Sequence, residues 1–306
     1  MNRMSEMDKQ LNEMARVLSE LDDLTATKSL LVWLIKTHGI QNATPLAGIH
    51  EQSDVFVLTA GDGSELILKA HQQLAAAKRE FMAYRMLSGV GFQSVPQLVD
   101  VWSEDARFLL LEKMPGTPAM TASSKLYGRA GQLLDQLHKA PYRDLDSMPL
   151  AEAYVRRGTA LFQHLLESSE RSLLETCIRV LGDKVIGRRV MCHRDYRRRN
   201  WLIAPGADEI SLIDFGQCRA DYYLCDFVHV YMETMACGLT SSWHAFVEGY
   251  GRTLKDDERS ILSALIGLYG LTTLVRIRRG QGQGCAVEGT RYCAVSRRLM
   301  NHRSSC

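Results

Sequence analysis

The stretch His193-Arg-Asp-Tyr-Arg-Arg-Arg-Asn200 forms a polar loop that leads, through two short apolar segments, to Asp214-Phe-Gly216. The apolar segments are residues 201–204 and 209–213, and the turn residues Pro205-Gly-Ala-Asp-Glu separate them. Short apolar runs joined by a turn that contains Gly and Pro are typical of a β-hairpin. The sequence therefore predicts a hairpin that brings the end of the polar loop next to the Asp-Phe-Gly triplet.

The two ends of this hairpin carry oxygen ligands. Asn200 precedes the first strand and Asp214 follows the second, so an amide oxygen and a carboxylate can share one hard cation, with Asp195 a loop away as a third oxygen group. Mg²⁺ takes few protein oxygens and keeps its remaining positions for water and phosphate. A single Asp beside a strand is more often a turn residue, but that role does not explain so many polar residues in this order. We therefore expect Asn200 and Asp214 to hold Mg²⁺.

Hydrophobic periodicity divides the chain into a strand-rich part and a helix-rich part. Before the breaker Pro115-Gly-Thr-Pro, short apolar runs predict a mainly antiparallel sheet with one internal helix, with strands at 54–59, 65–70, 96–102 and 107–112 and the helix at 74–88. After it, helical spacing predominates, with helices expected at 123–139, 151–166, 169–181, 224–237, 241–250 and 256–276.

Two further amphipathic helices are expected at 11–21 and 29–38. The predicted fold class is therefore α+β, with N-terminal helices in residues 1–43, a β-rich lobe in 44–114 and an α-rich lobe in 115–306.

The composition is that of a soluble globular enzyme or binding protein, with 46% apolar residues, 24% charged residues and seven prolines. The net charge of +2 is too small to favour nucleic acid or an anionic membrane as a partner. Residues 1–23 lack the pattern of a secretory signal, and the apolar stretch Ser29–Ile35 is too short to span a bilayer, so we expect a cytoplasmic protein. The eight cysteines include no C-x-x-C pair, which indicates reduced thiols.

The pattern H-x-D-x-x-x-x-N, a hairpin and D-F-G resembles the catalytic and metal-binding signature of the kinase superfamily. No A-P-E triplet follows Asp214, and the short connection to Asp226 leaves no room for a long activation loop. With the predicted helix around Gly131–His138, these features resemble the aminoglycoside phosphotransferase and choline kinase-like branch, which acts on small molecules. The resemblance covers about residues 44–250 and implies a two-lobed, protein-kinase-like fold with a small antiparallel β lobe and a larger α-helical lobe. One departure is Arg194, because a glycine commonly stands there in the antibiotic-kinase branch.

In the β-rich lobe the resemblance implies a binding site for ATP. Lys69 ends a strand and Glu80 lies on the next helix, so the two look like the ion pair that grips the α- and β-phosphates. The segment that ends in Ser53-Asp occupies the place of the phosphate-covering loop, which makes Ser53 a candidate contact. Backbone groups from Glu112 to Met114 are the expected partners of the adenine.

In the α-rich lobe the resemblance implies the catalytic groups. Asp195 would orient the substrate hydroxyl and accept its proton. Arg197 would lie over the γ-phosphate. His193 and Asp226 are expected to brace the loop.

The predicted activity is transfer of the γ-phosphate of ATP, with Mg²⁺, to a hydroxyl of a small molecule of the aminoglycoside, peptide-antibiotic or amino-alcohol type. Asp221, Glu233 and the acidic run Asp256-Asp-Glu258 would suit a cationic acceptor, although such runs are common on solvated helix ends. Two alternatives stay open: a protein kinase, against which the missing A-P-E triplet argues, and a nucleotide-binding pseudokinase without turnover.

Overall fold

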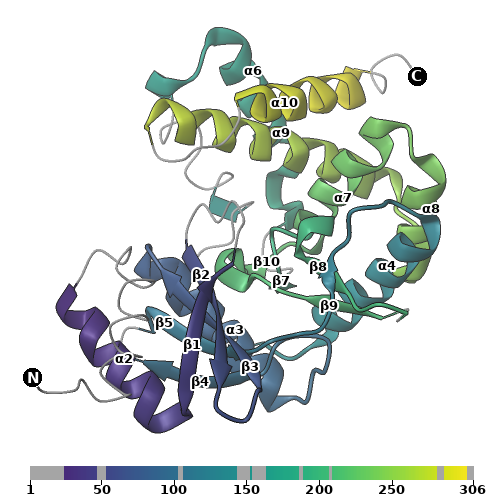
Figure 1. Cartoon of the computed structure of the whole chain (residues 1–306). Helices are drawn as coiled ribbons and strands as arrows, with labels where there is room; N and C mark the ends of the chain where they lie inside the picture. The colour runs from purple at the N-terminus through teal and green to yellow at the C-terminus, as the bar shows by residue number, and fades with distance from the viewer. Residues whose placement is uncertain are drawn as a thin grey trace, which may run out of the picture. The chain divides into compact units, whose positions relative to one another are not determined.

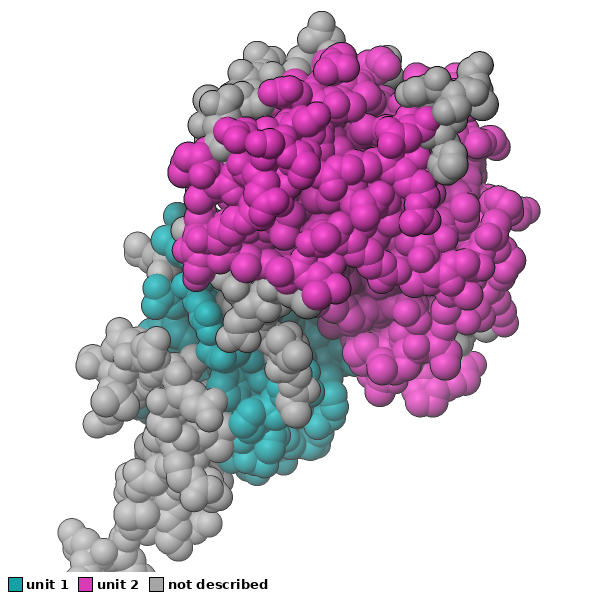
Figure 2. Space-filling model, turned by 90° about the horizontal axis from the view of Figure 1, so that it is seen from above, with its two compact units in different colours: residues 1–115 teal, residues 116–306 magenta. Residues whose placement is uncertain are grey.

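The computed structural model describes residues 24–46, 53–102, 106–142, 152–153, 163–185, 189–206, 209–280 and 286–301 (Figure 1). The helix expected at 11–21 and most of the one expected at 151–166 lie outside these residues. The chain forms two compact units, Met1–Pro115 and Gly116–Cys306, shown in teal and magenta in Figure 2.

The first unit is built on a five-stranded antiparallel sheet with the strand order β1-β2-β3-β5-β4. Its elements are α2 (Leu24–His38), β1 (Ile40–Pro45), β2 (Ser53–Ala60), β3 (Glu65–His71), α3 (Leu74–Gly89), β4 (Leu98–Trp102) and β5 (Phe108–Glu112). Residues 40–43, which the sequence groups with N-terminal helices, belong to the edge strand β1 because Gly39, at a φ of 63°, ends α2.

The two faces of strand β3 have different neighbours. Leu68 and Ala70 belong to the apolar core that Leu30, Leu31 and Leu34 of α2 form with the sheet. Successive side chains of a strand point to opposite faces, so Lys69 and His71 lie on the other face, where Glu80 of α3 contacts both of them. The alternation thus separates the apolar core from a buried polar group.

The second unit is mainly helical. Its elements are β6 (Thr117–Pro118), α4 (Ser124–Lys139), α6 (Ser168–Leu181), β7 (Val190–Cys192), β8 (Trp201–Ile203), β9 (Ile210–Leu212), β10 (Arg219–Asp221), α7 (Phe227–Glu233), α8 (Thr240–Gly249), α9 (Asp256–Arg278) and α10 (Ala286–Asn301). The predicted hairpin is confirmed as β8–β9, in which Trp201 lies opposite Leu212. The helix predicted at 224–237 is shorter, because 3₁₀ turns at Tyr223–Cys225 and Met235–Cys237 flank α7.

Helix α9 runs through the core of the second unit. Among the described residues it is the helix that is long and apolar enough, by length and composition, to cross a membrane, and 67% of its apolar stretch is buried inside the protein. It packs against α6 and α10 (Figure 1). A Cβ on Gly270 would lie 2.8 Å from the Gly289 carbonyl oxygen, so α9 and α10 approach closely at these two glycines. This packing accounts for the apolar composition of α9.

Candidate active site

The hairpin β8–β9 positions the predicted metal ligands next to each other. The Ile213 N–H donates to the Asn200 carbonyl oxygen at 3.1 Å, which closes the end of the hairpin between Asn200 and Asp214. Asp214 has a φ of 69°, in the left-handed region that non-glycine residues rarely adopt. Such strained positions are concentrated at functional sites, and the αL backbone here directs the chain sharply out of the hairpin.

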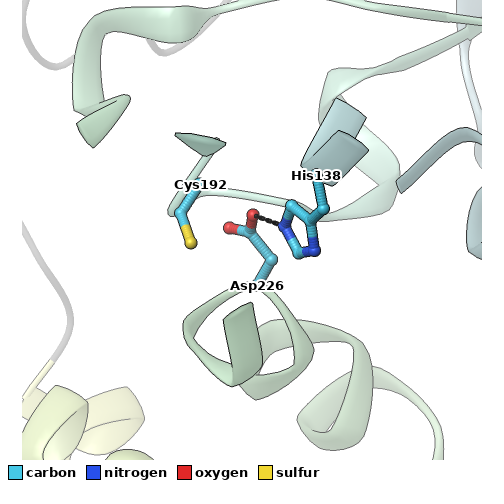
Figure 3. Close-up of side chains that lie close together, drawn as sticks. All are labelled: His138, Cys192 and Asp226. Carbon is cyan, nitrogen blue, oxygen red and sulfur yellow. Dashed lines mark hydrogen bonds and ion pairs between the residues drawn. The ribbon is translucent and has the colours of Figure 1, made fainter. Parts of the chain in front are cut away.

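Asp226 holds the polar loop through its main chain. The backbone N–H groups of His193 and Arg194 both donate to its carboxylate, the first at 2.9 Å. The carboxylate is fully buried and also contacts His138 Nε2 at 3.0 Å (Figure 3). His138 Nδ1 lies 2.9 Å from the Tyr250 hydroxyl. The contacts agree with the bracing role expected for Asp226.

His138, Cys192 and Asp226 form a cluster whose ligand-type atoms all lie within 4.8 Å of one another (Figure 3). A metal would need a deprotonated thiol, but burial, followed by the charge of Asp226, raises the pKa of Cys192 well above its ordinary value. The Cys192 thiol donates to the Tyr222 carbonyl oxygen at 3.5 Å. Because the other two side chains are engaged by hydrogen bonds, we interpret the cluster as part of the brace.

His193 connects the loop to the hairpin. Its Nε2 lies 2.9 Å from the Ile213 carbonyl oxygen, and its Nδ1 accepts the Asp195 N–H at 3.3 Å. A neutral ring that donates from Nε2 and accepts at Nδ1 satisfies both contacts. The predicted bracing role of His193 therefore has a structural basis.

Arg194 has a backbone conformation that suits glycine. Its φ is 66°, a left-handed conformation that glycine adopts without strain. Its side chain is buried, with Nε 3.5 Å from Asp221 Oδ2, and the Tyr269 hydroxyl donates to its carbonyl oxygen at 3.1 Å. The prediction that Asp221 contacts a cationic acceptor is wrong, because this carboxylate is fully buried against Arg194.

The carboxylate of Asp195 is engaged by three neighbours on its own loop. Its Oδ1 lies 2.6 Å from Arg197 Nε, and its Oδ2 accepts from Arg199 Nη2 at 2.8 Å and from Asn200 Nδ2 at 2.9 Å. Burial would raise its pKa, but Arg197, His229 and Arg199 outweigh burial and hold the pKa of Asp195 well below its ordinary value. Asp195 is therefore a fixed, ionised carboxylate.

Arg197 lies against Asp195 and against two residues that the sequence analysis missed. Its Nη2 is 3.0 Å from His229 Nε2, and its Nη1 is 3.6 Å from Glu288 Oε1. His229 Nδ1 in turn lies 2.8 Å from the Tyr292 hydroxyl. These contacts make Arg197 a positioning group for Asp195, and its contact with a phosphate stays a prediction.

In the first unit, Lys69 and Glu80 form the predicted ion pair. Lys69 Nζ lies 3.0 Å from Glu80 Oε1 and 2.8 Å from Oε2. His71 Nε2 also lies 2.9 Å from Glu80 Oε2, a contact that the alternation of β3 could have predicted, because His71 is two residues beyond Lys69. Burial would raise the pKa of Glu80, but Lys69 and His71 outweigh burial and lower it from 4.5 to about 2.

The other nucleotide-site candidates lie at strand ends. Ser53 begins β2, is buried, and stands opposite His71 in the register of β2 and β3. Glu112 ends β5, and its N–H donates to the Gln97 carbonyl oxygen at 2.9 Å, so this amide is already bonded within the protein. The other backbone groups from Glu112 to Met114 remain candidates for hydrogen bonds to the adenine.

The comparisons with known proteins agree with this geometry. A model of the phosphotransferase enzyme family matches residues 42–262. The chain belongs to this family. It is a phosphotransferase that acts on a hydroxyl group, as predicted. No curated protein sequence matches the chain significantly.

Three solved structures illustrate the shared fold. A spectinomycin phosphotransferase in complex with ADP and spectinomycin has a TM-score of 0.63 at 14% identity, with 89% of this chain and 97% of that chain covered. A macrolide 2'-phosphotransferase from Brachybacterium faecium gives 0.61 at 15%, with 87% and 97% covered. An aminoglycoside 2''-phosphotransferase in complex with gentamicin gives 0.64 at 16%, with 87% and 95% covered. The likeness confirms the predicted α+β, kinase-like fold.

Proposed function

We propose that this phosphotransferase moves the γ-phosphate of ATP to a hydroxyl group of a small molecule and that Asp195 orients that hydroxyl. The observation that carries the proposal is the loop itself, in which Asp195, Asn200 and Asp214 lie on a loop and hairpin held by Asp226. ADP in the related spectinomycin phosphotransferase supports a nucleotide as donor.

The residues at the hairpin end fit a magnesium ion. The Asn200 amide nitrogen donates to the carbonyl and carboxylate oxygens of Asp195, at 2.8 and 2.9 Å, which turns the amide oxygen away from Asp195. An amide oxygen and a carboxylate are hard donors of the kind that Mg²⁺ prefers. Asn200 and Asp214 would hold the ion, which when bound neutralises charge on the phosphates.

Asp195 has room for one hydroxyl. A carboxylate offers about four lone-pair sites, and Arg199 and Asn200 use the two on Oδ2. Oδ1 has Arg197 Nε at 2.6 Å and His229 Nε2 at 3.6 Å, and it is the oxygen that would accept from a substrate hydroxyl. A hydroxyl that donates there is oriented by a fixed anion, and the low pKa of Asp195 means that positioning outweighs proton abstraction in its contribution.

Lys69 would bind the α- and β-phosphates of the nucleotide. Its ammonium is held on both oxygens of Glu80, so its position is set before a nucleotide arrives. Ser53 and the backbone near Met114 would complete the nucleotide site.

A small-molecule acceptor is favoured over a protein. The connection after Asp214 is occupied by a 3₁₀ turn, β10 and a second 3₁₀ turn at Tyr223–Cys225, so it offers no extended loop to receive a peptide strand. The solved relatives bind spectinomycin and gentamicin, both small molecules. We place the enzyme in the cytoplasm, as expected from the sequence.

The test is ADP release with Mg·ATP and a panel of small hydroxyl compounds, for the wild type and for Asp195→Asn. The variant is expected to lose about 10²–10⁴-fold in rate, the usual contribution of a positioned base, while nucleotide affinity stays unchanged. Asp135→Asn is the matched control, because Asp135 forms an exposed pair with Lys139 on α4. Unchanged turnover in Asp195→Asn would remove this carboxylate from the mechanism, and nucleotide binding without release of ADP would favour the pseudokinase.

A further inference from the structure

Arg197 connects Asp195, on the catalytic loop of residues 193–200, to helix α7. Its Nε lies 2.6 Å from Asp195 Oδ1, and its Nη2 lies 3.0 Å from Nε2 of His229. Both partners of the arginine are buried. The guanidinium is a rigid planar group, so the contact of Nη2 with His229 fixes the direction in which Nε faces the carboxylate.

The contact with Arg197 determines where the His229 ring carries its proton. A guanidinium donates hydrogen bonds and accepts none, so Nε2 of His229 is the unprotonated acceptor and Nδ1 carries the proton. Burial, and after it the charge of Arg197, lowers the pKa of His229 well below its ordinary value, which keeps the ring neutral. Nδ1 therefore donates to the Tyr292 hydroxyl oxygen, which is 2.8 Å away.

Arg197 lies against two acceptors that are close to each other. His229 Nε2 is 3.6 Å from Asp195 Oδ1, and an unprotonated ring nitrogen and a carboxylate oxygen both present lone pairs. The positive charge of Arg197, in contact with both atoms, allows them to stay this close. Without the ring nitrogen, Nη2 would lose its acceptor and the guanidinium could turn away from Oδ1, the oxygen that would accept from a substrate hydroxyl.

Helix α10 supports this arrangement from outside the part of the chain that matches the family. The family model ends at residue 262, whereas Glu288 and Tyr292 lie on α10. The two residues are four positions apart and so share one face of the helix. Tyr292 accepts from His229, and Glu288 Oε1 lies 3.6 Å from Arg197 Nη1. Both contacts are therefore additions that the matched residues 42–262 do not contain.

We propose that His229 is a positioning residue for phosphate transfer: held by Tyr292, it orients Arg197 and thereby fixes the carboxylate of Asp195 for the substrate hydroxyl. The proposal rests on the proposed function and deepens it. Because His229 acts through Arg197, its loss should slow turnover while nucleotide binding stays unchanged. Helix α10 then contributes to catalysis through Tyr292.

Two amide substitutions separate the two hydrogen bonds of the ring. A glutamine amide reaches the position of Nε2 and can accept from Arg197, whereas an asparagine amide reaches that of Nδ1 and can keep only the bond with Tyr292. His229→Asn should lower kcat by about 10²-fold, the effect of displacing a catalytic group by about 1 Å. His229→Gln should restore most of this loss. The Kd of Mg·ADP, measured by calorimetry, should stay unchanged in both variants.

The rate measured is ADP release from Mg·ATP, with water and with the small hydroxyl compound of highest turnover as acceptors. A double-mutant cycle tests whether His229 acts through Arg197: in an Arg197→Met background, His229→Asn should cause little further loss of kcat. Tyr292→Phe should lower kcat less than His229→Asn, and this effect should also vanish in the Arg197→Met background. Tyr231→Phe is the matched control and should leave kcat unchanged, because Tyr231 lies on the same helix α7 and packs against Trp243.

The outcomes separate this proposal from the proposed function. Thermal unfolding shows whether each variant is folded, and if His229→Asn is not, the cycle of Tyr292→Phe with Arg197→Met decides. Equal kcat values for His229→Gln and His229→Asn, losses that multiply in the cycle, or unchanged kcat in His229→Asn would overturn the positioning role. Wild-type turnover in Asp195→Asn, or no ADP release from the wild type, would refute the proposed function itself.

Discussion

Replacing Glu80 by Gln removes the negative charge from a buried ion pair of the first unit. Glu80 is fully buried and contacts both Lys69 and His71. Glutamine has nearly the same shape, so the change tests charge and hydrogen bonding without opening a cavity. The Lys69 ammonium, which is also buried, would lose its counterion.

The expected loss of stability can be worked out in two ways. Breaking a buried pair by removing one partner costs about 3–5 kcal/mol. Independently, the pKa of Glu80 falls from 4.5 in the unfolded chain to about 2 in the folded protein, which corresponds to about 3 kcal/mol at neutral pH. Because the folded pKa is the lower one, this stabilisation is present above pH 4.5 and is lost as the pH falls toward 2. About 2 kcal/mol of it should disappear between pH 7 and pH 3.

The assay is unfolding by urea over this pH range, with hydrogen exchange of peptides from β3 and α3 as a readout of the first unit alone. The wild type should lose about 2 kcal/mol more than Glu80→Gln on acidification. Glu65→Gln is the matched control, since Glu65 forms an exposed pair with Lys113, and exposed pairs contribute at most about 1 kcal/mol. Parallel pH profiles for the wild type and Glu80→Gln, or equal losses in the two variants, would refute the reasoning.

Two further changes test the second unit. Asp214→Ala should raise the Mg²⁺ concentration needed for half-maximal nucleotide binding more than Asn200→Ala does, because a carboxylate offers a full charge and an amide only a dipole; equal or reversed effects in a Mg²⁺ titration would contradict the hairpin-end site. Gly131→Ala should lower the free energy of unfolding by about 2 kcal/mol or more, since its Cβ would collide with the backbone of α8. Gly128→Ala, whose Cβ would lie 3.6 Å from its nearest neighbour, should be neutral or stabilising by up to about 1 kcal/mol. Thermal unfolding of both variants measures the difference, and similar effects of the two alanines would argue against close packing of α4 on α8.

Local signals were sufficient to predict the hairpin and the proximity of its two ends. The strands that flank Pro205-Gly are apolar and short and pair in an antiparallel register, so the proximity of Asn200 and Asp214 follows from the chain over a few residues. The pair of Lys69 and Glu80 required the resemblance as well, because a strand and the next helix do not by themselves determine which side chains meet.

Contacts between distant segments could not be predicted in this way. Glu288 and Tyr292 lie on α10, in a tail to which the sequence analysis assigned no role, and they reach the catalytic loop only through the packing of α10 on α9. Asp221 is polar and follows the Asp-Phe-Gly triplet, so the sequence favoured an exposed contact. Its burial depends on the contact with Arg194. The positive φ of Arg194 is set by tertiary structure, and the local propensity of an arginine does not predict it.

The Asp226 carboxylate holds the catalytic loop by accepting hydrogen bonds from two backbone N–H groups of the loop, those of His193 and Arg194. The anchorage is therefore indifferent to which residues the loop carries after Asp195. A substitution of Arg198, whose guanidinium contacts Glu233 and the Met120 carbonyl oxygen, can therefore alter what the loop recognises while the backbone frame and the contacts of Asp195 persist.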